Sequence, residues 1–137
     1  MKKRILALDF GEKRIGVAIS DRLGFIARAY KTVLFDESQR AIRKIKQICQ
    51  KESISKIVIG LPLNLKGESG FQAKKTKEFA KALQKEVHLV IAFQDERFSS
   101  KEAERILKEQ NIKGKKEKID ALSAVFILNQ YLEKEDV

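Results

Sequence analysis

The sequence predicts an α/β layered domain, and three observations support this prediction. Strand-like apolar runs alternate with segments of helical periodicity along most of the chain. The first three runs are joined by short turns that contain glycine, which indicates an antiparallel meander. The fourth and fifth runs each follow a helical segment, which indicates right-handed crossovers into a mixed sheet covered by helices. With 137 residues, the chain has the length of one ordinary domain, so we expect a single domain over residues 1–137.

The amino-terminal third predicts three strands and the start of a helix. The strands RILALDF, RIGVAIS and ARAYKTVLF correspond to residues 4–10, 14–20 and 27–35. From residue 37 the period changes to that of an amphipathic helix, whose apolar face includes Cys49. A lone cysteine on such a face is predicted to be a buried thiol rather than a nucleophile.

The remaining two thirds predict parallel strands and helices. The run KIVIGL, at 56–61, is rich in β-branched residues, as is typical of a parallel strand that is buried on both faces. Ser99 and Glu102 have the spacing of a capping box, so a helix is expected to begin there. His88 lies at the expected start of the fifth strand and is interpreted as structural or exposed rather than catalytic. The other expected elements are a helix over 71–86, a strand over 88–94 and a last helix over about 117–132.

The charge balance favours a polyanionic partner. The chain has 29 Lys and Arg residues against 19 Asp and Glu residues, a net charge of +10, and nucleic acid is the commonest polyanion that such proteins bind. No apolar run approaches the roughly 20 residues that a membrane span requires. The first apolar run is interrupted at Asp9 and no signal-peptide cleavage site follows, so we expect a cytoplasmic protein with no membrane partner.

Carboxylates stand at the ends of two predicted strands. Asp9 ends the first strand, and Glu96, next to Asp95, ends the fifth. Open α/β folds build their sites at the carboxyl ends of parallel strands, so Asp9 and Glu96 are expected to converge on one edge of the sheet. The alternative for Asp9 is an aspartate that only forms the turn before Gly11.

A third carboxylate, Asp120, lies in the predicted last helix. From Ile119 to Leu128 this helix is apolar nearly all round, which indicates that it packs into the body of the protein. Asp120 shares a helix face with Ala124 and Ile127, and an unpaired carboxylate directed at a packed surface is costly. The alternative is that Asp120 lies in the first turn, where the helix dipole favours an acid and solvent reaches it.

The three acids together predict a divalent-metal site. Carboxylates that cluster at neutral pH repel one another, and divalent cations relieve the repulsion. Oxygen ligands select Mg²⁺ or Mn²⁺, and two such ions can hold a phosphodiester, activate water and stabilise the leaving oxygen. We therefore expect Asp9, Glu96 and Asp120 to be the metal ligands and catalytic residues of a phosphodiester hydrolase. Asp95 ranks second because it should project to the opposite face of the strand.

Glycines, hydroxyls and basic residues near these acids are candidates for substrate contact. Glycine permits tight turning or the close approach of a phosphate, and an arginine beside a catalytic acid can clamp a phosphate in bidentate fashion. For each of them the alternative is an ordinary turn glycine, a solvated lysine or an arginine paired with a nearby acid. The expected supporting residues are Gly11, Gly16, Gly67, Ser99 and Ser100, and the expected nucleic-acid contacts are Lys13, Arg14, Lys66 and Arg97. A possible basic stripe on the second helix, or only a solvated face, consists of Lys74, Lys75, Lys77, Lys81 and Lys85.

Four motifs, LALDFGEKRIGVAISD, IVIGLPLNLKGESG, DERFSS and KIDALSAVFIL, resemble in order and spacing those of the YqgF/RuvX family, the RuvC-like branch of the ribonuclease H superfamily. The resemblance covers essentially the whole chain. It implies a ribonuclease H-like three-layer fold, whose five-stranded mixed sheet has three antiparallel and then two parallel strands, with the first strand central beside the fourth. It maps the family's metal-binding acids onto Asp9, Glu96 and Asp120. Where the family commonly has Leu-Thr-Thr after DER, this chain has Phe98, Ser99 and Ser100, which keeps the hydroxyls.

The resemblance implies a nuclease but leaves its substrate open. Family members are described either as nucleases that mature the 5′ end of 16S rRNA precursor in ribosome biogenesis or as Holliday-junction resolvases in DNA recombination and repair. The expected partner is therefore pre-rRNA, with ribosomal precursor particles, or branched DNA. No large apolar dimer face is evident, so a monomer is favoured.

Two alternatives belong to other functional classes. One is a non-catalytic nucleic-acid-binding or ribosome-associated factor with a vestigial acid cluster. The other is an actin-like or sugar-kinase-type nucleotide binder, which is disfavoured because Glu12 and Lys13 follow Gly11 where those proteins have Thr or Ser.

Overall fold

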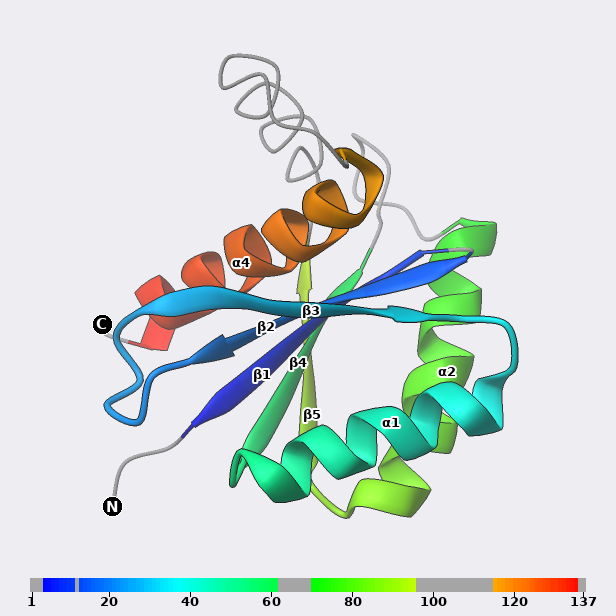
Figure 1. The fold of residues 1–137 in the computed structure, drawn as a ribbon, viewed down its shortest axis with the longest axis horizontal. Coiled ribbons are helices and arrows are strands. Elements are labelled where there is room, and N and C mark those ends of the chain that lie inside the picture. Colours follow the sequence, from blue (N-terminus) through cyan, green and yellow to red (C-terminus); the bar gives the residue numbers. More distant parts are fainter. Residues whose placement is uncertain (1–3, 12, 62–69, 96–114, 136–137) are drawn as a thin grey trace.

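The computed structural model describes residues 4–11, 13–61, 70–95 and 115–135. Within them, five strands form one mixed sheet with helices on both faces, which confirms the predicted α/β layering (Figure 1). The strand order is β3-β2-β1-β4-β5. The elements are β1 (Ile5–Phe10), β2 (Arg14–Ser20), β3 (Ala27–Leu34), α1 (Ser38–Lys51), β4 (Lys56–Leu61), α2 (Phe71–Val87), β5 (Val90–Asp95) and α4 (Lys115–Glu135).

Strand pairing follows the predicted meander and crossovers. β2 is antiparallel to both β1 and β3, whereas β4 is parallel to both β1 and β5. β1 is therefore the central strand and has β2 and β4 as its neighbours. This position gives residues near the end of β1 close neighbours on both sides.

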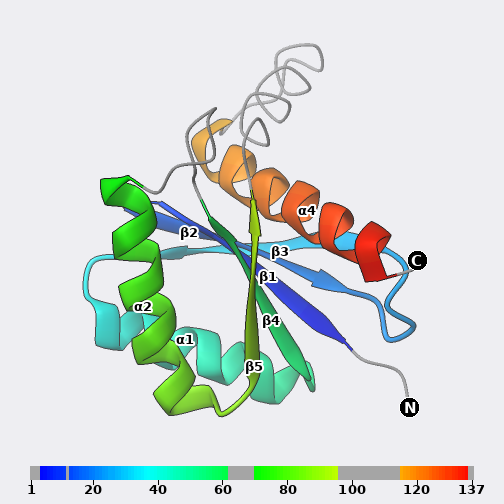
Figure 2. The ribbon, with the colours of Figure 1, turned by 180° about the vertical axis from the view of Figure 1, so that it is seen from behind.

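The side chains of β1 alternate between two apolar cores. Leu6, Leu8 and Phe10 face α1 and α2, and they are at most 5% exposed. Ile5 and Ala7 face the opposite way and pack with α4. Figure 2 shows the same division, with α1 and α2 on one side of the sheet and α4 on the other. The two buried faces explain why β1 and β4 are continuously apolar rather than alternating.

Helix α4 crosses its face of the sheet with a defined direction. The Lys56 ammonium, at the start of β4, donates a hydrogen bond to the Tyr131 hydroxyl and lies 4.8 Å from the centre of that ring. Lys56 is the register partner of Ile5 at the start of β1. The carboxyl end of α4 therefore covers the starts of the parallel strands, and its amino end lies toward their carboxyl ends (Figure 1).

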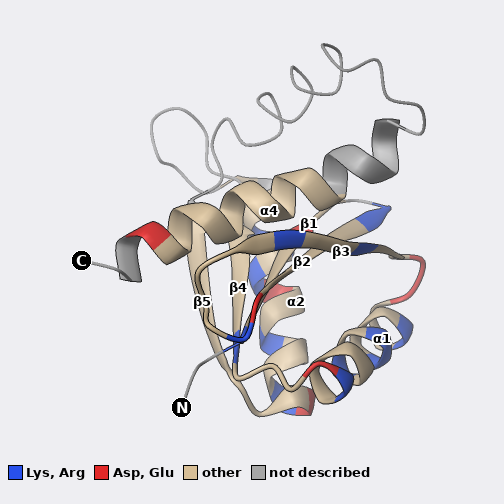
Figure 3. Ribbon diagram, turned by 60° about the vertical axis from the view of Figure 1, so that its left-hand side comes forward, with Lys and Arg blue, Asp and Glu red and all other residues tan. Residues whose placement is uncertain are grey.

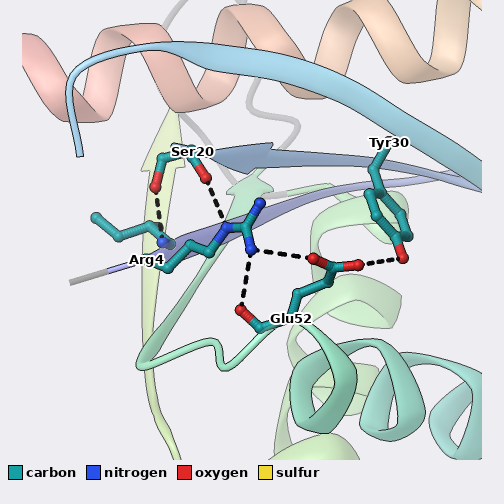
Figure 4. A network of polar contacts seen from close by, with 5 residues as sticks. Arg4, Ser20, Tyr30 and Glu52 are labelled. Carbon is teal, nitrogen blue, oxygen red and sulfur yellow. Dashed lines mark hydrogen bonds and ion pairs between the residues drawn. The ribbon is translucent and has the colours of Figure 1, made fainter. Parts of the chain in front are cut away.

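A polar network joins the start of the sheet to the end of α1 (Figure 4). The Arg4 guanidinium donates to a Glu52 carboxylate oxygen over 3.0 Å and to the Ser20 carbonyl over 3.0 Å. The Tyr30 hydroxyl donates to the other Glu52 oxygen over 2.8 Å. This hydrogen bond is the main reason why the pKa of Tyr30 is raised, since ionisation would place a phenolate against the carboxylate.

The observed boundaries differ from the predicted ones by two or more residues at the start of β5 and at both ends of α4, which extends to Glu135. His88 does not start a strand: it is the exposed C-cap of α2, in the left-handed conformation at φ 54° and ψ 33°, and β5 begins at Val90. Helix α4 begins at Lys115, so the turn-like segment before residue 117 includes the first residues of the helix. The helix expected from Ser99 lies outside the described residues.

Cys49 is a buried core residue, as the sequence predicts. Its side chain packs among the apolar residues of α1, and the residue is 6% exposed. Burial raises the pKa of this thiol to about 11, because the thiolate would lose its hydration. Cys49 is therefore poorly suited to be a nucleophile at neutral pH.

Candidate active site

Asp9 lies near the carboxyl end of the central strand and is half-buried. Its neighbours Leu8 and Phe10 belong to the core formed with α1 and α2. Alternation along the strand therefore directs Asp9 to the opposite face, which α4 covers. The apolar residues on both sides in sequence fix this carboxylate at the α4 face, since a shift by one residue would bury it in the other core.

Glycines occupy the positions beside Asp9 on both neighbouring strands. Gly16 of β2 is the register partner of Asp9 and is buried. On β4, Gly60 follows Ile59, the parallel register partner of Leu8, so it is the corresponding residue next to Asp9, and it is also buried. Because neither glycine has a side chain, β2 and β4 contribute only backbone at these two positions. Glycine within a strand is typical of a place where a ligand or another backbone approaches closely.

The same row of the sheet continues to polar side chains. Thr32 of β3 pairs with Gly16, and Gln94 of β5 pairs with Gly60. Gln94 is 6% exposed, and Ser123, on the facing helix α4, is fully buried. Sequence reasoning did not select Gly60, Gln94 or Ser123. The signal for Gly60 was present, since it interrupts the β-branched run KIVIGL.

The other predicted acids are only partly placed. Asp120 belongs to α4, and Asp95 is the last residue of β5, but the side chains of both lie outside the described part of the structure. Glu96 follows β5 directly and lies outside the described residues altogether. Among the side chains that are described, no three His, Cys, Asp or Glu residues are grouped so that they could hold a metal ion.

The first hairpin brings basic residues to the same end of the sheet as Asp9. Lys13 is exposed in the turn, and Arg14 begins β2. Arg14 lies on the Asp9 face by alternation with Ile15, which faces the other core. Its Nε is buried and has no hydrogen-bond partner within the described residues. A guanidinium in this state is suited to donate to an anionic group of a substrate.

Gly11 is required by the geometry of this hairpin. Its backbone N–H donates to the Arg14 carbonyl over 2.9 Å, and a Cβ at this position would lie 2.8 Å from that same oxygen. The remaining predicted contacts, Lys66, Gly67, Arg97, Ser99 and Ser100, lie outside the described residues.

The substitution Gly11→Ala is expected to lower the free energy of unfolding by about 1–3 kcal/mol, because the added methyl group forces the Arg14 carbonyl away. Thermal melting with and without the substitution measures the effect. Gly70→Ala is the matched control, since a Cβ there meets nothing within 4 Å. The control is expected to change stability by less than about 1 kcal/mol. Equal melting temperatures for the Gly11 variant and the unmodified chain would contradict the tight-turn interpretation.

Comparison with protein families identifies the lineage of this site. Residues 3–134 match the family model of RuvX, which is described as a Holliday junction resolvase. The chain belongs to the RuvX family. One RuvX relative, from Sulfurihydrogenibium sp. (strain YO3AOP1), is 52% identical over 133 residues, which cover 96% of this chain and 90% of the relative. Another, from Syntrophomonas wolfei, is 44% identical over 132 residues, which cover 95% and 94% of the two chains. Both carry the description "Putative pre-16S rRNA nuclease".

Solved structures confirm that RuvX has the ribonuclease H-like fold of resolvases. Thermus thermophilus RuvC in complex with a Holliday junction substrate superimposes with a TM-score of 0.61, at 13% identity, over 98% of this chain and 96% of RuvC. The fowlpox virus resolvase bound to Holliday junction DNA gives a TM-score of 0.56, at 12% identity, over 96% and 98% of the two chains. At this level of identity the likeness establishes the fold alone. It agrees with the strand order described above.

Proposed function

We propose that this RuvX protein is a divalent-metal-dependent endonuclease that hydrolyses phosphodiester bonds, with Asp9, Glu96 and Asp120 as its metal ligands. The observation that carries the proposal is the position of Asp9. It lies at the carboxyl end of the central strand, between two glycines, on the face that α4 covers. Glycines beside a carboxylate leave room for a cation and a phosphate to approach it together.

The direction of α4 supports the inclusion of Asp120. Tyr131 is level with the start of β1 through its bond to Lys56. Residue 120 precedes residue 131 by about 16 Å along the helix axis, and residue 9 follows residue 5 by about 13 Å along the strand. Positions 120, 124 and 127 also have the spacing of a single stripe along the helix. Of these residues, Ala124 and Ile127 are fully buried against the sheet. Residues 9 and 120 therefore fall near the same level along the sheet.

Strand alternation supports Glu96 rather than Asp95. Ala92 packs on the α4 side of the sheet, and Gln94 follows it on that side. Residues two apart in a strand share a face, so a strand that continued past β5 would carry position 96 on the same face as Gln94; Glu96 itself lies outside the described residues. Glu96 is therefore proposed as the ligand, and Asp95 is kept second in rank.

In the proposed reaction, each group of site residues has a separate role. When bound, Mg²⁺ or Mn²⁺ supplies Lewis-acid activation of water and stabilisation of the leaving oxygen. The three carboxylates hold and orient the cations, and the glycines beside Asp9 leave room for the scissile phosphodiester. Arg14 and Lys13 donate to phosphate oxygens near the cleavage point, which fixes the register of the strand. The apolar core behind β1 keeps the carboxylate in place during the reaction.

The proposed substrate is the 5′ end of 16S rRNA precursor, because relatives that are 52% and 44% identical to this chain carry the description "Putative pre-16S rRNA nuclease". We propose that the chain acts as one domain and as a monomer, in the cytoplasm, on ribosomal precursor particles. The second candidate is a Holliday junction in DNA, which the family description and the RuvC fold favour. No helix in the described ranges has the length and apolar content to cross a membrane.

The purified chain is expected, with Mg²⁺ or Mn²⁺, to cleave precursor 16S RNA and to leave a four-way DNA junction intact. Gel analysis of both labelled substrates measures this, and an unbranched DNA duplex is the control for nonspecific cleavage. Cleavage of the junction alone would favour the resolvase. If both substrates are bound but neither is cut with either metal, the nuclease proposal fails and the non-catalytic factor takes its place.

A further inference from the structure

A groove of about 540 Å³ follows the β5 edge of the sheet beside α2. Its floor is apolar and is formed by Ile91 and Phe93 of β5 and by Ala80 of α2. Its rim is cationic and is formed by Lys77, Lys81 and Lys85 of α2. The groove lies on the face opposite Asp9, because Ile91 packs with the core of α1 and α2.

The groove combines an exposed aromatic side chain with regularly spaced charges. Phe93 is 42% exposed, which is unusual for an aromatic residue on a strand. The three lysines are exposed and are spaced four residues apart, so they follow one side of α2. The first and last are separated by about 12 Å along the helix, which corresponds to three or four stacked nucleotides at about 3.4 Å each.

This combination selects one class of ligand. A small anion would gain nothing from the apolar floor, and an apolar peptide would gain nothing from the lysines. A single-stranded nucleic acid uses both, since its bases stack on aromatic rings while its phosphates contact Lys residues. We propose that this groove, formed by α2 and β5, binds the single-stranded part of the substrate outside the active site.

The position of the groove connects it with the proposed cleavage point. Phe93 immediately precedes Gln94, which lies in the same row of the sheet as Gly60 and Asp9. β5 is two strands from β1, or about 10 Å across the sheet. A strand that passes over the carboxyl edge of the sheet from Asp9 can therefore enter the groove. The inference rests on the proposed function, because it takes nucleic acid to be the substrate.

The distribution of charge also favours nucleic-acid binding on the side of the sheet that carries the groove. Figure 3 shows Lys and Arg residues along α1 and α2, whereas α4, which covers the Asp9 face, has almost no charged residue among those described. Glu133 is the charged residue within 121–133 of α4. Since affinity for nucleic acid comes mainly from Lys and Arg, much of the binding is expected from the side of the sheet that carries the groove.

The test removes the three lysines of the groove by Lys77→Gln, Lys81→Gln and Lys85→Gln. Binding to a fluorescent single-stranded oligoribonucleotide is measured in EDTA, over a range of salt concentrations, so that cleavage does not interfere. The variant is expected to bind at least tenfold more weakly, and the slope of log K against log salt is expected to fall by about 2, at about 0.7 per phosphate contact.

The chain offers a matched control at the other edge of the sheet. A second groove, of about 500 Å³, lies between β3 and α1 and is lined by Lys31, Lys44 and Lys51. Replacing these three lysines by Gln removes the same charge, and it is expected to weaken binding less than threefold. An equal loss of affinity in the two triple variants would overturn the inference, because general charge would then explain both.

Substitution of Phe93 tests the stacking surface separately. Phe93→Leu keeps an apolar side chain but removes the ring, and it is expected to weaken binding at least fivefold. Phe93→Tyr keeps the ring and is expected to bind as the unmodified chain does. Thermal melting verifies that both variants are folded. If Phe93→Leu binds the RNA as tightly as the unmodified chain does, the stacking role is wrong. In a separate competition experiment, displacement of the RNA from the groove by a polyglutamate peptide at equal concentration would favour an acidic protein as the partner.

The outcomes separate this inference from the proposed function. If the unmodified chain does not bind RNA or DNA even at low salt, the proposed nucleic-acid substrate itself is wrong. If it binds and the lysine variant binds equally well, only the groove is wrong. Cleavage of a short RNA that reaches the active site alone is expected to be unchanged in the lysine variant, whereas cleavage of a long RNA is expected to slow.

Discussion

Replacing Asp9 with Asn is expected to lower the rate of phosphodiester cleavage by about 10³-fold or more, because it removes a charged group from the proposed metal site and with it several kcal/mol of transition-state stabilisation. The amide has nearly the same shape as the carboxylate, so the fold is expected to persist. Binding of nucleic acid is expected to change little, since it depends on Lys and Arg. Single-turnover cleavage and thermal melting measure the two effects.

A metal titration followed by thermal melting tests the proposed role of Asp9 in cation binding without a cleavage assay. Mn²⁺ is expected to raise the melting temperature of the unmodified chain, because a cation that binds the folded state stabilises it. It is expected to have no such effect on the Asn variant. Asp21→Asn is the matched control, because Asp21 directly follows β2, outside the proposed metal site, and its carboxylate accepts hydrogen bonds from the N–H groups of Phe25 and Ile26. Substantial cleavage by the Asp9 variant would contradict the mechanism.

Replacing Glu52 with Ala is expected to lower the free energy of unfolding by about 2–3 kcal/mol. The substitution removes hydrogen bonds to Arg4 and Tyr30, and it leaves the Arg4 guanidinium, whose side chain is 16% exposed, without its carboxylate. The Arg4 guanidinium also donates hydrogen bonds to the carbonyls of Ser20 and Glu52. The loss of the Glu52 carboxylate is therefore expected to weaken the packing of both the start of β1 and the last turn of α1. Urea denaturation of the two chains measures the difference.

An exposed ion pair provides the control for this second prediction. Arg40 contacts Asp36 over 2.7 Å, but both side chains are more than half exposed. Asp36→Ala is expected to cost less than about 1 kcal/mol, because water already solvates both charges. A similar loss in both variants would show that burial does not strengthen the Glu52 network.

The pH dependence of this network has a definite sign. The pKa of Tyr30 is raised in the folded chain, chiefly by its hydrogen bond to Glu52. The contribution to stability is therefore complete below the ordinary tyrosine pKa of 10.0 and is lost as the pH rises through the folded value. The difference in stability between the unmodified chain and Tyr30→Phe is accordingly expected to shrink above that ordinary pKa.

Local patterns in the sequence were sufficient for most of the secondary structure. The runs that became β1, β2 and β4 are short, apolar and rich in β-branched residues, as is typical of buried strands, and the period of α1 is unambiguous. The boundary at His88 was missed because a left-handed cap depends on the chain direction after the helix, which residue composition does not report. The start of α4 was missed for a similar reason, since a run of Lys and Glu suits both a helix and a turn.

The sequence alone determined which residues are chemically capable: the acids Asp9, Glu96 and Asp120, and the excess of Lys and Arg. It determined the strand on which Asp9 lies, because the alternation of apolar residues is a local property. Only the tertiary structure decided that Gly16 and Gly60 flank Asp9, and that three lysines line a groove beside Phe93. Register between strands and packing of a helix on a sheet edge bring distant residues together, and no local pattern encodes those contacts.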